Sequence, residues 1–110
     1  MSFRVRNNII YLTRGDTFKA VVSITYPDGS VYTPKEGDKV RFALKETIDD
    51  EECLIWRDIP IDTMLLILYP EDTKELEFGN YVYDIQLTKA NGDVDTFITA
   101  SKLKITAEVE

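Results

Sequence analysis

Histidine is absent from this chain of 110 residues, and cysteine occurs only once, at Cys53. Without histidine, the chain cannot build Ser-His-Asp or Cys-His nucleophilic machinery, a histidine zinc site or the usual near-neutral general base. A single cysteine excludes an intrachain disulfide and a thiolate zinc site. Because the neighbouring Glu51 and Glu52 oppose a thiolate, we expect Cys53 to be a small apolar filler.

Long apolar runs and targeting signals are also missing. The longest apolar run covers residues 64–69 and is far too short to span a bilayer. Arg4 and Arg6 have no apolar segment behind them, so the N-terminus lacks the pattern of a signal peptide. These absences predict a protein that is cytoplasmic on synthesis, has no membrane partner, and leaves the cytoplasm only within a larger particle, as a virion-associated protein does.

Phosphate-binding loops and an excess of positive charge are missing as well. The five glycines are scattered through predicted turns, and the 20 acidic and 13 basic residues give a net charge of −7. This charge argues against a broad nucleic-acid-binding face. Catalysis by two carboxylates would need a pair set across a cleft, and no pair is singled out. We therefore predict no enzyme, no cofactor and no metal site, and we assign no catalytic or ligand-binding residue.

Two short motifs have structural interpretations. Residues 49–52 (Asp-Asp-Glu-Glu) offer oxygen ligands to a cation such as calcium, but they lack the spacing and the glycine of a calcium loop. A solvated acidic loop is the favoured interpretation. Arg14-Gly15-Asp16 spells the tripeptide that integrins bind, yet it lies at a predicted turn where glycine is expected in any case.

The clearest pattern that is present lies at residues 80–88. Apolar and polar positions alternate there, with Tyr81, Tyr83, Ile85 and Leu87 on one side and Val82, Asp84, Gln86 and Thr88 on the other. Successive side chains of a strand point to opposite faces, so the first set is predicted in a core and the second in water. Residues 89–93 follow, and Asn91-Gly92 predicts a hairpin because both residues tolerate positive φ.

Other segments predict further short strands separated by turns. Strands or short extended segments are expected at residues 8–13, 17–26, 31–33, 39–45, 54–61 and 64–69. The run at 64–69 is apolar on both faces, which favours a central strand. Residues 94–109 are predicted as one long strand with a bulge or kink near Ala100 and Ser101. Residues 70–76 form the only plausible helix, with Pro70 near its start and acids in its first turn.

These seven to nine short strands, spaced about ten residues apart, predict one all-β domain over residues 1–110, an antiparallel sandwich or barrel. The inward faces are expected to hold most aromatic residues: Phe18, Tyr26, Phe42, Tyr81 and Tyr83. Leu103, Ile105, Ala107 and Val109 are expected to face inward at the end of the chain.

From residue 64 onward the chain resembles the end of an immunoglobulin-like sandwich. An apolar strand is followed by a short acidic corner and then by Gly79-x-Tyr81-x-Tyr83. In that fold a tyrosine at this corner bonds back to the backbone and pins the turn, and the resemblance implies this role for Tyr81. The inter-sheet cysteines of antibody domains are missing, so the resemblance is to a disulfide-free relative.

A narrower resemblance covers most of the chain. Its motifs are Arg14-Gly15-Asp16-Thr17 before an alternating strand; Tyr26-Pro27-Asp28-Gly29-Ser30 with Gly37-Asp38-x-Val40-x-Phe42; and Leu76-x-x-Gly79-x-Tyr81-x-Tyr83-Asp84-Ile85-Gln86-Leu87, then Asn91-Gly92 and Ile105-Thr106-x-Glu108-Val109. This order is similar to small immunoglobulin-like domains of phages and prophages of Gram-positive bacteria, including the N-terminal domain of baseplate upper proteins.

The resemblance implies a non-enzymatic structural module of a phage or prophage particle, in a baseplate, tail or connector. Its partners would be other phage structural proteins or further copies of itself, bound through sheet edges and loops. The alternative is a small ligand-binding module for carbohydrate that uses Trp56, Tyr32 or Phe97 as a stacking platform. Neither interpretation includes a nucleic-acid or membrane partner.

Overall fold

The computed structural model describes residues 3–6, 9–26, 28–47, 49 and 52–107. These residues form ten strands and one four-residue helix, so the predicted all-β character is confirmed, with more strands than the seven to nine expected. The excess arises because residues 3–6 form a strand that the alternation pattern does not predict, and because residues 17–26 divide into two strands.

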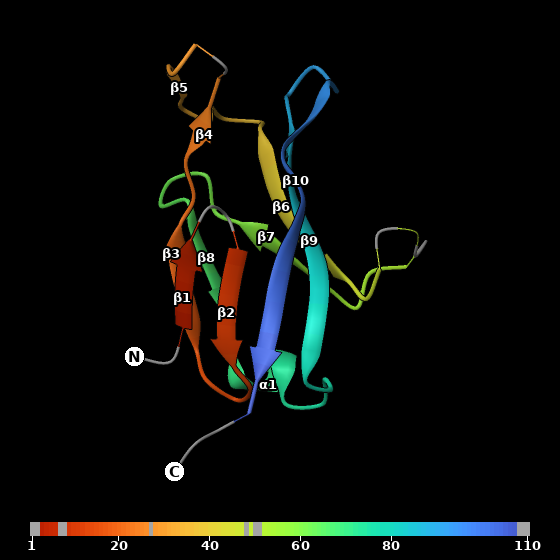
Figure 1. Cartoon of the computed structure of the whole chain (residues 1–110). Helices are drawn as coiled ribbons and strands as arrows, with labels where there is room; N and C mark the ends of the chain where they lie inside the picture. Colours follow the sequence, from red (N-terminus) through yellow and green to blue (C-terminus); the bar gives the residue numbers. More distant parts are fainter. Residues whose placement is uncertain (1–2, 7–8, 27, 48, 50–51, 108–110) are drawn as a thin grey trace.

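Six strands form the main sheet, shown in Figure 1. Their order across the sheet is β1 (Phe3–Arg6), β2 (Ile9–Thr13), β10 (Val94–Thr106), β9 (Gly79–Thr88), β6 (Lys39–Lys45) and β7 (Ile55–Ile59). Neighbouring strands are antiparallel except for β2 and β10, which run parallel. Strands β1 and β7 are therefore the edges of this sheet.

The remaining strands make two small ladders. Strand β3 (Phe18–Val21) pairs with β8 (Leu65–Leu68), and β4 (Ile24–Thr25) pairs with β5 (Val31–Tyr32). The prediction of one strand over residues 17–26 is wrong, because the β3–β8 ladder ends where the Val22 amide donates to the Met64 carbonyl at 2.8 Å. Beyond that point the chain finds a new partner in β5.

The prediction that residues 64–69 form a central strand is also wrong. Within the part of the chain that the structure describes, β8 pairs with β3 alone. Leu66 and Leu68 are buried, whereas Leu65 and Ile67 are only half-buried. The apolar residues on the second face of the strand are therefore partly covered. Partial covering of this face does not require a second neighbouring strand.

Apolar side chains from the six-stranded sheet, from the β3–β8 pair and from residues 22–24 share one core. The buried apolar members are Ile10, Leu12, Phe18, Val22, Ile24, Val40, Phe42, Leu44, Ile59, Leu66, Leu68, Tyr81, Tyr83, Ile85, Leu87, Leu103 and Ile105. The inward faces predicted for β6 and β9 are confirmed. The prediction that Tyr26 faces the core is wrong, because its side chain is 41% exposed. Tyr26 follows β4 and packs edge-to-face with Tyr32, at 6.0 Å between the ring centroids.

The C-terminal strand and its hairpin form largely as predicted. β10 is one long strand, and its register against β9 shifts between Thr96 and Ile98 and again between Ile98 and Ser101, as expected for bulges. Ala107 is exposed rather than inward because the strand has ended at Thr106. Val109 lies outside the described residues.

The turn between β9 and β10 differs from the expected one. Only Gly92 takes positive φ, at 97°, while Asn91 does not. The Gly92 amide donates to the Lys89 carbonyl, and the Lys89 amide donates to the Asp93 carbonyl, each at 2.8 Å. This pattern is a three-residue hairpin loop with a glycine bulge, so glycine is required at one position of the turn and not at two.

The corner before β9 is pinned by a tyrosine. Helix α1 (Pro70–Thr73) is a single turn at the predicted place. The Tyr81 hydroxyl donates to the Glu77 carbonyl at 2.7 Å, which is the backbone bond expected of this residue. From the other side, the Gly15 amide donates to the Thr73 hydroxyl oxygen at 3.2 Å. The guanidinium of Arg14 lies 4.1 Å from the ring centroid of Phe78, so its side chain packs within the fold.

We predict that Tyr81→Phe lowers the free energy of unfolding by about 1 kcal/mol, because the Glu77 carbonyl then loses its hydrogen bond from the Tyr81 hydroxyl. Urea unfolding followed by circular dichroism measures this change. Tyr26→Phe is the matched control, since the Tyr26 hydroxyl has no hydrogen bond among the described residues. Equal midpoints for the two variants would contradict a stabilising corner.

The opposite end of the fold is tied together by a buried carboxylate. Asp38 is 8% exposed; it accepts the Tyr32 hydroxyl at 2.5 Å, the Lys35 amide at 2.9 Å and the Ala90 amide at 3.1 Å. These bonds join β5, the loop before β6 and the β9–β10 turn. The loop approaches the turn so closely that a Cβ on Gly37, at φ 94°, would lie 2.8 Å from the Ala90 Cβ.

The hydrogen bond to Asp38 raises the pKa of Tyr32 to about 12. The Lys35 amide, followed by the Tyr32 hydroxyl, holds the pKa of Asp38 below its ordinary value. Because the folded-state pKa lies below the unfolded value of roughly 3.9, this stabilisation is fully present above that value. It is lost as the pH falls through the lower folded-state pKa.

We therefore predict that wild type and Asp38→Asn differ most in stability near neutral pH and converge as the pH falls below about 4. Urea midpoints measured from pH 7 down to pH 3 test this. Asp62→Asn, an exposed carboxylate in the turn before β8, serves as the control for the change of charge. A constant offset between wild type and Asp38→Asn across the range would show that the carboxylate charge is not the stabilising feature.

Candidate protein-interaction site

Strand β7 is an edge of the main sheet, and two large apolar side chains on or beside it are exposed. It pairs with β6 on one side, and no described strand pairs with its other side. Leu54 and Trp56 are 46% and 52% exposed. Unpaired backbone groups of an edge strand can accept a partner strand, and exposed large apolar residues beside them add contact area.

The register with β6 decides which face each β7 side chain occupies. Trp56 lies opposite Ala43 and Asp58 lies opposite Arg41, so both point to the outer face of the sheet. The Arg41 guanidinium stacks 4.4 Å from the Trp56 ring centroid, and its Nε lies 3.3 Å from Asp58 Oδ1. Trp56 is therefore held against the sheet by one ring face.

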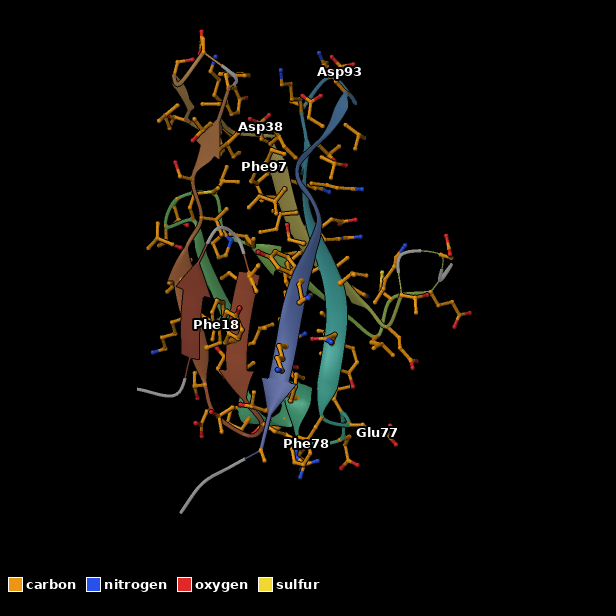
Figure 2. The ribbon with its side chains drawn as sticks, viewed as in Figure 1. Phe18, Asp38, Glu77, Phe78, Asp93 and Phe97 are labelled. Atoms are coloured by element: carbon orange, nitrogen blue, oxygen red, sulfur yellow. The ribbon has the colours of Figure 1, made fainter. Side chains whose placement is uncertain are left out.

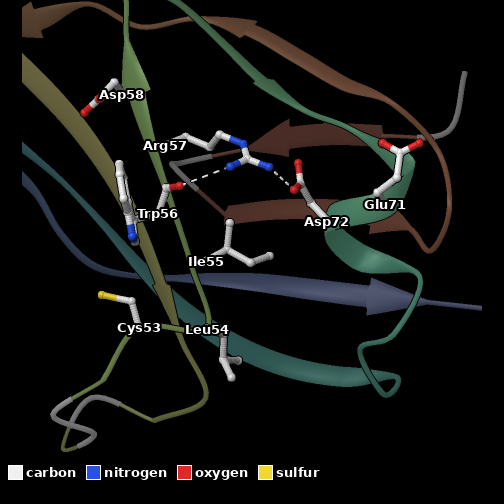
Figure 3. A pocket seen from close by; sticks show the side chains of 8 residues that line it. All are labelled: Cys53, Leu54, Ile55, Trp56, Arg57, Asp58, Glu71 and Asp72. Atoms are coloured by element: carbon white, nitrogen blue, oxygen red, sulfur yellow. Dashed lines mark hydrogen bonds and ion pairs between the residues drawn. The ribbon is translucent and has the colours of Figure 1, made fainter.

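An open groove of about 700 Å³ lies between the free side of β7 and helix α1, as Figure 3 shows. Its lining residues are Cys53, Leu54, Ile55, Trp56, Arg57, Asp58, Glu71 and Asp72. Arg57 points across the groove and forms an ion pair with Asp72. Asp72 also accepts the Tyr69 amide at 2.8 Å, which fixes the carboxylate at the start of α1.

Arg57 also covers part of the edge. Its Nη1 donates to the Trp56 carbonyl at 3.3 Å, on the side of β7 that faces away from β6 in Figure 3. Covering an edge carbonyl with a charged side chain limits indiscriminate strand pairing. A strand that binds here replaces one weak side-chain bond, while the Arg57–Asp72 pair holds the far wall of the groove.

The outer face beside β7 is basic, although the whole chain has a net charge of −7. The register places two acidic side chains on the described part of this face, Asp58 and Asp84. Five basic side chains lie on the same face: Lys39, Arg41, Lys45, Lys102 and Lys104. The outer face around Trp56 therefore carries a local excess of positive charge.

The three aromatic residues named as alternatives for a stacking platform lie in separate parts of the fold. Trp56 lies on the outer face of β7, whereas Tyr32 is on β5 with its hydroxyl bound to Asp38. Phe97 is half-buried on β10 and packs against the core. The residues that the sequence did not single out are Leu54, Arg57 and Asp72, because their proximity arises only when α1 folds beside β7.

Neither Cys53 nor the acidic residues at 49–52 form a site among the described residues. Cys53 is exposed at the rim of the groove, so the prediction that it fills the interior is wrong; it lies in the loop before β7. Asp49 and Glu52 are exposed, while Asp50 and Glu51 lie outside the described residues. Within the described ranges, no three acidic or cysteine side chains are grouped so as to hold a metal ion. No helix in that part of the chain has the length and apolarity needed to cross a membrane.

No protein-family model matches this chain, and no curated protein matches it.

Two aspartates of the site allow a matched test of its rigidity. We predict that Asp72→Asn destabilises the protein by about 1.5 kcal/mol, because Arg57 then loses its charged partner at a largely buried carboxylate. Asp58→Asn breaks the exposed pair with Arg41 and is expected to change stability by less than about 0.5 kcal/mol. Thermal or urea unfolding compares them, and equal effects would mean that the groove wall is not held by Arg57.

Proposed function

We propose that this chain is a non-enzymatic structural module of a phage or prophage particle that assembles through protein–protein contacts at strand β7. The observation that carries the proposal is an edge strand with Leu54 and Trp56 exposed beside an open groove. Main-chain hydrogen bonds from an added strand would supply affinity, and the Trp56 surface would supply specificity.

The finer fold assignment is part of the same proposal. We infer an immunoglobulin-like sandwich in which the six-stranded sheet faces the β3–β8 pair. Support comes from the shared core, the parallel pairing of β2 with β10, and the Tyr81 bond at the corner before β9. The Phe42 and Tyr83 rings pack against each other inside this core, 5.5 Å apart between centroids.

A second copy of this chain is the occupant that we propose for β7. A two-fold axis beside an edge strand pairs the strand with its own image in antiparallel orientation, which closes the assembly and removes the edge. Each copy then supplies the same Trp56 surface to the other. Another structural protein of the particle, with an acidic strand to match the basic outer face, is the competing occupant.

The test is the native mass of the purified protein by size-exclusion chromatography with light scattering over a range of concentrations. We expect a dimer or a closed assembly built from dimers. We expect Leu54→Lys to shift it to the monomer, because a lysine at the rim of the edge opposes strand addition. Val94→Lys is the matched control, since Val94 is 57% exposed but lies at the far hairpin on β10.

A monomeric wild type at all concentrations would exclude the second copy as occupant. In that case the acidic structural partner would be sought by co-purification with wild type and with Leu54→Lys. Equal association of Leu54→Lys and Val94→Lys with whichever partner binds would contradict a role for β7.

A further inference from the structure

A second cavity lies at the end of the molecule opposite α1. It has a volume of about 340 Å³ and lies between β4 and the hairpin end of β9 and β10. Its lining residues are Ile24, Thr25, Tyr26, Leu87, Asp95, Thr96 and Phe97. Figure 2 shows Phe97 on the side of β10 that faces β4. The volume is at the lower end of the roughly 300–1,000 Å³ typical of small-molecule sites.

Two aromatic residues line this cavity, and a neighbouring ring braces one of them. Tyr26 is 41% exposed, and the Tyr32 ring braces it edge-on at an interplanar angle of 80°. Tyr32 is itself anchored by its bond to the buried Asp38. Phe97 sits at the register shift between Thr96 and Ile98, where the bulge turns it toward the cavity and the edge of the core.

Asp95 brings a carboxylate to the lining of this cavity. It lies opposite Leu87 in the β9–β10 ladder, and Leu87 is 2% exposed on the core-facing side of the sheet. Asp95 itself is exposed, so its carboxylate is accessible to a ligand in the cavity. Asp95 has no hydrogen bond or ion pair among the described residues, and it lines the cavity with the hydroxyl-bearing Thr25 and Thr96.

From this arrangement we propose that the cavity binds a neutral sugar ring of a carbohydrate. The apolar C–H face of a pyranose packs on an aromatic ring, and its hydroxyl groups donate to a carboxylate. Tyr26 and Phe97 supply the ring faces, and Asp95 supplies the acceptor. This site is separate from β7 and does not depend on the assembly function.

A cationic ligand would use the same ring faces and the same carboxylate. The surroundings favour the neutral sugar, because the Lys89 ammonium already lies 5.4 Å from the centroid of the Tyr32 ring that braces Tyr26. That positive charge opposes a second cation nearby, while it does not oppose a sugar hydroxyl.

The test is a titration of ¹⁵N-labelled protein, followed by two-dimensional NMR, with glucose, galactose, rhamnose, N-acetylglucosamine and N-acetylgalactosamine. At least one sugar is expected to give saturable shifts confined to the amides of residues 24–26, 87 and 95–97. Tyr26→Ala is expected to abolish these shifts; Tyr26 is outside the buried core, so the variant retains its fold. Asp95→Asn is expected to weaken binding about tenfold.

Asp93→Asn is the matched control, because Asp93 lies two residues from Asp95 and does not line the cavity. It is expected to bind sugar as wild type does. The proposal is overturned if all five sugars leave the spectrum unchanged, or if Tyr26→Ala and Asp93→Asn bind equally well. It is also overturned if tetramethylammonium, and no sugar, shifts these amides, since the cavity would then be a cation site. None of these outcomes changes the native mass expected from assembly through β7.

Discussion

The structure depends on strand β9, which is hydrogen-bonded along its length to β6 on one side and to β10 on the other. Its inward side chains, Tyr81, Tyr83, Ile85 and Leu87, are all 8% exposed or less and contribute to the common core. Without this strand the main sheet would separate into two parts. Strand β9 runs without a break from the corner at Tyr81 to the hairpin that Asp38 contacts. It therefore connects the two groups of side-chain hydrogen bonds at the ends of the molecule.

A different set of side-chain contacts stabilises each end of the molecule. At the corner, the Tyr81 hydroxyl satisfies the Glu77 carbonyl, and Arg14 packs on Phe78. At the hairpin end, the Asp38 carboxylate gathers a hydroxyl and two amides from three segments. Neither set of contacts involves the free side of β7, beside which lie α1 and the Arg57–Asp72 pair. Both ends of the fold are therefore held by side-chain hydrogen bonds, and we place its contacts with other proteins at the lateral edge formed by β7.

The sequence predicts well what depends on local alternation. The bounds of β6, the inward face of β9, the one-turn helix at Pro70 and the hairpin at Gly92 all follow from nearby residues. It fails where the outcome depends on a distant partner. Residues 17–26 alternate as one strand, but the end of the ladder with β8 divides them and leaves Tyr26 exposed. The groove and the cavity also join residues distant in sequence, so the spacing of Arg57 and Asp72, or of Tyr26 and Asp95, carries no signal of their proximity.

The central claim, assembly by strand addition to β7, is tested most directly by residue-resolved amide hydrogen exchange on the wild type at low and at high protein concentration. We expect exchange to slow, as the assembly forms, at those amides of residues 55–59 that do not bond to β6, because these edge amides acquire partners. The already paired amides of β6 and β9, and the Leu54 amide that donates to the Leu44 carbonyl, are expected to change little. A native mass that rises with concentration while these edge amides exchange at an unchanged rate would contradict the central claim, since the contact would then lie elsewhere on the molecule.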